Sequence, residues 1–132
     1  MTTNTSMCVY NRCTDEQKNV VFKKHLIDNV FWDDSKDINI NTGYEKADDV
    51  NVFIPKSQKN MSGYVEPKKY KGLNGTWTLE NGDFIVKGNT SENEVLSLKE
   101  LAKKYDNVFI ISLVDDKDFG SESMHHFEIR GK

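Results

Sequence analysis

The dipeptide Asn81-Gly82 lies between two segments rich in apolar and β-branched residues, and it restricts the fold of this chain more than any other feature. Asn-Gly accepts the positive φ angles that both central positions of a type I′ turn require, and this turn joins the strands of a tight β-hairpin. A two-residue loop would place four apolar side chains on one face of that hairpin. The predicted pairs are Leu79 with Phe84 and Trp77 with Val86. We therefore predict a β-hairpin over residues 76–87 and a chain that is mainly β.

Several other short segments have the composition or the period-two alternation of β-strands. They are residues 7–11, 19–27, 30–33, 37–41, 49–55, 107–114 and 125–130. Residues 30–33 either continue the strand before them or begin another, and Pro55 ends its strand because proline cannot donate to a ladder. Residues 107–114 are almost continuously apolar. We therefore expect a central strand there that is buried on both faces.

One helix is predicted over residues 97–105. Ser97 and Glu100 fit a capping box, in which the two side chains satisfy free backbone N–H groups. The apolar stripe that follows with helical spacing consists of Leu98, Leu101, Ala102 and Tyr105. About eight short strands with one helix indicate a small β-barrel or sandwich. The side chains expected in its core are Trp77, Leu79, Phe84, Val86, Phe109, Ile111 and Phe127.

Composition limits the class of protein. The 132 residues are enough for a single domain, residues 1–132, in which residues 1–6 form a flexible polar tail. The net charge of −3 gives no overall attraction to nucleic acid, and no apolar run approaches the length of a membrane span. The first residues lack the features of a signal peptide, so we expect folding in a cytoplasm and reduced thiols at Cys8 and Cys13.

A long loop over residues 55–75 interrupts the strands and is the best candidate for a functional site. Loops of this length inside a compact domain are usually functional or disordered. We expect it to project as an arm that contacts a neighbouring subunit or lines a channel near phosphate groups, while a solvated loop is the simpler alternative. The residues expected to carry this role are Lys56, Lys59, Tyr64, Lys68, Lys69, Tyr70 and Lys71, with the two tyrosines as interface anchors.

The sequence predicts no catalytic residue, no metal and no cofactor. Neighbouring His125 and His126 on a strand would point to opposite faces, and Cys8 and Cys13 lack the spacing of a zinc pair. The paired aspartates are expected in solvated turns. A small hydrolase built around one of these histidines is the enzymatic alternative, and no nucleophile supports it.

Three segments of the chain resemble a small family of head and neck proteins of tailed bacteriophages, of the head-completion, stopper or head–tail connector type. These segments are residues 9–12, residues 75–79 with 82–88, and residues 114–132, with weaker support from residues 32–36. The resemblance spans nearly the whole chain. It rests on structural motifs, so it implies a family more strongly than it implies a mechanism.

The resemblance implies a non-enzymatic virion protein located in the neck and assembled in the host cytoplasm. Such a protein would form a ring of about six or twelve copies, join the portal or adaptor protein to the tail terminator protein, and continue the DNA channel. Contact with packaged DNA would be independent of sequence. The alternatives are a tail-completion or terminator protein of the same particle and a monomeric β-barrel that binds nucleic acid or a small ligand.

Overall fold

The computed structural model describes residues 3–33, 38–39, 43–44, 49–118, 120 and 124–132, and in these residues the chain is mainly β, as expected. The strands are β1 (Thr5–Thr14), β2 (Val20–Asp33), β3 (Ile38–Asn39), β4 (Gly43–Tyr44), β5 (Val50–Pro55), β6 (Phe84–Lys87), β7 (Glu94–Val95), β8 (Val108–Lys117) and β9 (His126–Gly131). The helices are α1 (Gln58–Met61), the short 3-10 helix η1 (Pro67–Lys69) and α2 (Leu98–Ala102). None of the helices in this described part of the chain has the length and apolar composition needed to cross a membrane.

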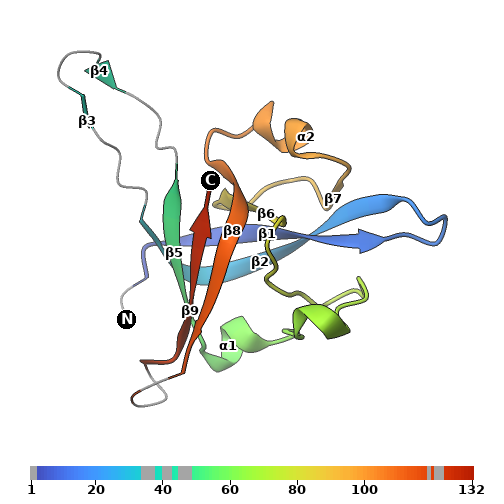
Figure 1. Ribbon diagram of the computed structural model, residues 1–132, viewed down its shortest axis with the longest axis horizontal. Helices are drawn as coiled ribbons and strands as arrows, with labels where there is room; N and C mark the ends of the chain where they lie inside the picture. The colour runs from blue at the N-terminus through green and yellow to red at the C-terminus, as the bar shows by residue number, and fades with distance from the viewer. Residues whose placement is uncertain (1–2, 34–37, 40–42, 45–48, 119, 121–123) are drawn as a thin grey trace.

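The strand pairings close into a ring. The order is β1-β6-β8-β9-β5-β2, all neighbours are antiparallel, and β2 pairs again with β1. Figure 1 shows β1 and β2 running across β5, β8 and β9. The pairings differ in length, since nine residue pairs join β1 to β2 and three join β2 to β5. The ring is therefore not a clear barrel.

The expected core side chains are all buried, and they divide between two clusters. The larger cluster lies between the crossing strands and includes Trp32, Trp77 and Phe127. The smaller cluster contains Tyr10, Phe22, Phe84, Val86 and residues from β7 and α2, which cover this part of the sheet. Burial of such side chains removes apolar surface from water on both faces of the sheet at β6.

Both faces are therefore buried at β6 and along residues 7–11 of β1, but not along the segment over residues 107–114. Along β8, Val108 and Phe109 are buried, but Ile110 is 37% exposed and Leu113 is 49% exposed. The covering layer of β7 and α2 does not extend along the whole outer face of β8. The expectation for residues 107–114 was correct for a strand and wrong for its burial, because an apolar run does not show which part of a sheet a second layer covers.

The predicted hairpin over residues 76–87 is wrong. A turn exists at Asn81-Gly82, but it is not type I′, because Gly82 has a positive φ and Asn81 does not. The amide of Asp83 donates to the carbonyl of Glu80 (3.1 Å), and Gly82 has φ 95°. Residues 76–80 form no strand beside β6, because β1 and β8 occupy both edges of β6. The backbone of Thr78 instead bonds to the Asn11 side chain, which donates to its carbonyl (2.7 Å) and accepts from its amide (3.1 Å).

The other local predictions have mixed outcomes. Residues 30–33 continue the strand before them as part of β2, and of residues 37–41 only 38–39 lie within the described part, as β3. Helix α2 is shorter than residues 97–105, and Ser97 makes no side-chain capping bond. Glu100 does reach back to the amide of Leu96 (3.0 Å), so half of the expected cap exists, one residue away.

The expected tail and loop are both folded where the structure describes them. Asn4 exchanges hydrogen bonds with the backbone of Trp32, and Thr5 and Ser6 belong to β1, so the prediction of a flexible tail over residues 1–6 is wrong from Asn4 onward. Residues 55–75 contain α1 and η1 and pack on the sheet. The prediction of a structureless projecting loop is also wrong.

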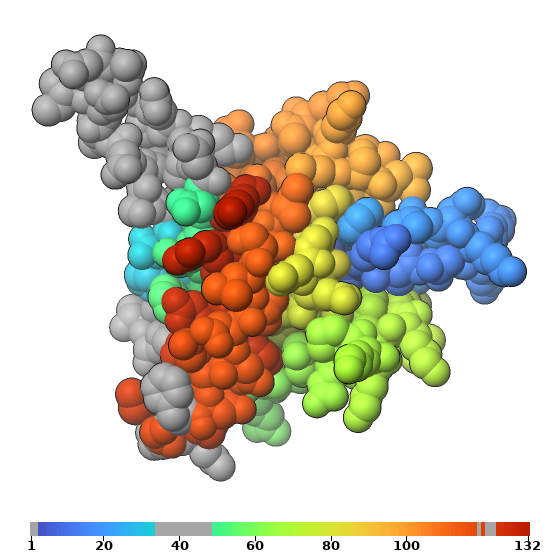
Figure 2. Space-filling view, viewed as in Figure 1, coloured from blue at the N-terminus to red at the C-terminus, as the bar shows by residue number. Residues whose placement is uncertain are grey.

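A two-stranded extension projects from the body instead, and we call residues 11–21 the β1–β2 ribbon. Figure 2 shows it extending beyond the rest of the molecule as the blue atoms at the right. Asp15 holds its turn, because its carboxylate accepts from the amides of Gln17 (2.9 Å) and Asn19 (2.8 Å). These bonds satisfy amide groups that the turn would otherwise leave to water.

Candidate functional site

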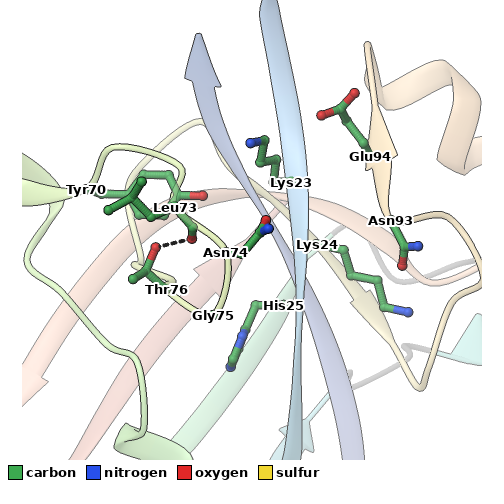
Figure 3. Close-up of a pocket in the computed structure, with 10 residues that line it drawn as sticks. All are labelled: Lys23, Lys24, His25, Tyr70, Leu73, Asn74, Gly75, Thr76, Asn93 and Glu94. Atoms are coloured by element: carbon green, nitrogen blue, oxygen red, sulfur yellow. Dashed lines mark hydrogen bonds between the residues drawn. The ribbon is translucent and has the colours of Figure 1, made fainter. Parts of the chain in front are cut away.

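Three neighbouring hollows that share lining residues lie beside β1, β2 and the 70–76 loop, and together we call them the cationic trough. The first is lined by Arg12 and Lys71, the second by Lys23 and Lys24, and the third by Lys59, with further residues in each. Tyr70 is shared by the first and second hollows, and His25 and Gly75 by the second and third. Figure 3 shows the second hollow, with the 70–76 loop on one side of β2 and Asn93 and Glu94 on the other.

The floor of the trough is β2, whose side chains alternate between its two faces. Lys23 and His25 are two residues apart and therefore share a face. The His25 ring stacks on Trp77 with centroids 5.1 Å apart and an angle of 7° between the planes. Burial lowers the pKa of His25, while the carboxylate of Asp28 opposes that shift. The imidazole at the floor of the trough therefore favours its uncharged form.

One wall is the loop over residues 70–76, and two close contacts fix it. A Cβ added at Gly63 would lie 2.0 Å from the carbonyl oxygen of Gly75, so the loop base approaches α1 as closely as only glycine permits. At the other end, Lys23 Nζ donates to the carbonyl of Gly72 (3.0 Å). Tyr70 begins this loop, and burial raises its pKa to about 12, with smaller contributions from Cys13 and Asp83. The phenol is thus a neutral hydrogen-bonding group.

The charge of the trough differs from that of the whole chain. Its lining includes five cationic side chains and two carboxylates, those of Asp28 and Glu94, whereas the chain carries −3. Among the described residues only Lys59 of these five forms an ion pair, with Asp28 (3.3 Å). Lys24 Nζ donates to the carbonyl of Thr90, a bond that orients the ammonium without neutralising it. The trough can therefore attract an anion.

The structure divides the seven predicted loop residues into three groups: those that line the trough, those on η1 and those with structural contacts. Tyr70, Lys71 and Lys59 line the trough. Lys68 and Lys69 lie on η1, with Lys69 4.0 Å from the carboxylate of Glu66, and neither lines these hollows.

The other two predicted residues have structural contacts. The Lys56 side chain is only 13% exposed, pairs with Asp116 and Asp118, and lies 4.6 Å from the centre of the Phe127 ring. The Tyr64 ring packs against Trp77 and Phe127, with centroids 5.0 Å away in each case. Tyr64 is consequently a half-buried core residue in this chain, and Lys56 joins the start of residues 55–75 to the end of β8.

Sequence reasoning missed Arg12, Lys23, Lys24 and His25. The alternation of residues 19–27 does place Lys23 and His25 on one face of a strand. No local signal shows that a loop some fifty residues later folds over that face.

The groups considered for catalysis or metal binding remain apart. In the described part of the chain no three acidic, histidine or cysteine side chains form a group that could hold a metal ion, and both cysteines are free thiols. Asp83 is a buried carboxyl group that accepts from the side chain of Asn11 (2.8 Å) and the amide of Arg12 (3.0 Å). Its carboxylate accepts from the Arg12 amide where β1 extends beyond its pairing with β6.

The fold and the trough together define a small, mainly β protein with a cationic surface groove. The chain belongs to the family described as Family of unknown function (DUF6751), whose model matches residues 1–132. Comparison with curated proteins gives no match, and comparison with solved structures gives none.

Proposed function

We propose that the protein is a non-enzymatic structural subunit of a tailed-phage neck, of the stopper or head–tail connector type. In this role a ring of copies joins the portal or adaptor protein to the tail terminator protein and continues the DNA channel. The resemblance of residues 9–12, 75–79 with 82–88, and 114–132 to phage head and neck proteins supports the class. The observation that carries the assembly role is the open edge of the β1–β2 ribbon.

That edge follows from the register of the sheet. β6 pairs with β1 only from Met7 to Tyr10. In an antiparallel ladder, alternate residues direct their backbone groups to the same side. Arg12, two residues after Tyr10, donates its amide to Asp83 instead of to a strand. Thr14 comes next on this side. It pairs with Val20 of β2 on its other side, but on this side it lines the first hollow of the trough and has no strand partner in the described part of the chain.

An unpaired strand edge can add a strand from another chain, which supplies affinity through main-chain hydrogen bonds. Most proteins shield such edges because they promote association. A projecting ribbon with an open edge is suited to join neighbouring subunits of a ring. This ribbon replaces the 55–75 segment as the proposed arm, because that segment packs on the sheet.

A proline at Thr14 tests this assignment. Thr14→Pro removes an amide on the open edge, whereas the ladder bond beside it, from Asp15 to Asn19 (2.9 Å), is retained. Glu16→Pro is the matched control, since Glu16 is the second residue of the turn in which Lys18 donates to Asp15 (3.0 Å), where proline is favoured. Each variant would be supplied to a phage lacking this gene, and joined particles counted by electron microscopy.

We expect Thr14→Pro to leave heads and tails unjoined and Glu16→Pro to restore joined particles. Thermal unfolding of both purified variants shows whether each is folded. If folded Thr14→Pro restored assembly as well as the wild type, the ribbon would not be the joining element.

We also propose two alternative functions for this chain. A tail-completion or terminator role would place the chain elsewhere in the same particle. A monomeric nucleic-acid-binding β-barrel is favoured by one specific observation, the cationic trough on a single chain.

A further inference from the structure

The three hollows of the cationic trough are neighbours that share lining residues, and the fold holds two of their cations in place. In the central hollow, Lys23 lies on the side of the 70–76 loop and Lys24 on the side of Asn93 (Figure 3). Lys23 is fixed by its bond to the carbonyl of Gly72, and Lys24 by its bond to the carbonyl of Thr90. Ammonium groups that are already oriented lose less conformational entropy when a ligand binds.

The two outer hollows of the trough are lined by further cations. Arg12 and Lys71 line the first hollow, and neither forms an ion pair among the described residues. Lys59 lies at the opposite end, where Asp28 partly offsets its charge. A row of cations suits a ligand with repeated negative charges better than a single anion.

We propose that the cationic trough binds the phosphodiester backbone of nucleic acid independently of base sequence. The hydroxyl of Tyr70 and the side-chain amides of Asn74 and Asn93 line the central hollow and add neutral hydrogen-bonding groups beside the lysines. Phosphate contacts of this kind position a protein on nucleic acid without reading bases. The inference rests on the proposed function in one respect, because a neck channel presents DNA to its subunits.

Fluorescence anisotropy with a labelled 20-base-pair duplex, measured across a range of salt concentrations, tests the inference. Arg12→Gln combined with Lys71→Gln removes two exposed cations that make no ion pair in the described part of the chain. Lys99→Gln combined with Lys103→Gln, on and beside α2, removes the same charge from exposed positions outside the trough.

We expect the trough variant to bind at least about tenfold more weakly at low salt and to lower the salt slope by about two, while the control changes affinity less than about twofold. Equal losses in the two double variants would overturn the inference, as would competition by polyglutamate at the same charge concentration.

The corresponding single strand provides the second arm. Binding of both duplex and single strand through the trough supports the inference. If only the single strand binds through the trough, the nucleic-acid site is supported. The link between that site and duplex DNA in a channel is then contradicted. Failure to bind either form overturns the site without affecting the position of the chain in a neck, which imaging of the particle determines separately.

Discussion

Asp83 shows at the scale of one residue how the end of a sheet strand is stabilised. Its carboxylate accepts from the amide of Arg12 and the side chain of Asn11, at a point where β6 no longer pairs with β1. The side chain is 2% exposed, and burial raises its pKa from 3.8 to about 6, although these two hydrogen bonds oppose the shift. The two hydrogen bonds favour the charged form of the carboxyl group, whereas burial disfavours that form and has the larger effect.

This conflict predicts a pH dependence of stability. The pKa is higher in the folded chain than in the unfolded chain, so folding takes up a proton between these values and the stabilisation is lost as pH rises through about 6. On acidification from pH 7 to pH 4, the wild type should gain about 2 kcal/mol relative to Asp83→Asn, which cannot titrate there. Urea unfolding of both proteins measures the difference, and a constant difference across this range would contradict the assignment.

Asn11 has the corresponding role at the scale of an element. It is fully buried and bonds to both backbone groups of Thr78 and to the Asp83 carboxylate, so it attaches residues 76–80 to β1. Asn11→Ala removes the partner of both backbone groups of Thr78 and one of the hydrogen bonds to the Asp83 carboxylate. We expect it to lower the free energy of unfolding by about 3 kcal/mol, since each unsatisfied buried group costs roughly 1–3 kcal/mol.

Hydrogen exchange gives a local test of this attachment. The amide of Thr78 should exchange faster in Asn11→Ala, because its acceptor is removed, whereas the control Asn74→Ala changes an exposed side chain and should leave it protected. Unchanged protection of Thr78 in Asn11→Ala would mean that another group holds this segment.

The elements predicted correctly are those whose signals are local. The buried residues of β5 and β9 recur with period two, and β1 and β2 were recognised from their apolar and β-branched composition. The 76–87 hairpin failed because an Asn-Gly turn does not show whether the edge of the next strand is free, and β6 is already paired on both sides. Pairing is a property of the whole chain.

The candidate site was only partly predictable for the same reason. Lys59, Tyr70 and Lys71 were identified because they lie in one basic segment. Arg12 and Lys23 lie on strands far from that segment in sequence, and only the fold brings them to the same trough. Lys56 and Tyr64 lie in the same basic segment, but Lys56 is mostly buried and Tyr64 packs against Trp77. The sequence of the segment does not show these contacts.

At the scale of the whole molecule, a closed ring of strand pairings leaves the β1–β2 ribbon projecting from the body (Figure 1). The hollows of the cationic trough are lined by residues of both strands near the base of this ribbon. We propose that these two features serve assembly and DNA contact respectively. Both depend on strand pairings that are distant in sequence, so they require the complete fold.

Cryo-electron microscopy of the phage neck that we propose to contain this chain tests the central proposal most directly. The account predicts a ring of this chain between the portal-bound adaptor and the tail terminator, with the β1–β2 ribbon against a neighbouring subunit. A particle that lacks the chain, or that contains it inside the capsid or at the tail tip, would contradict the account.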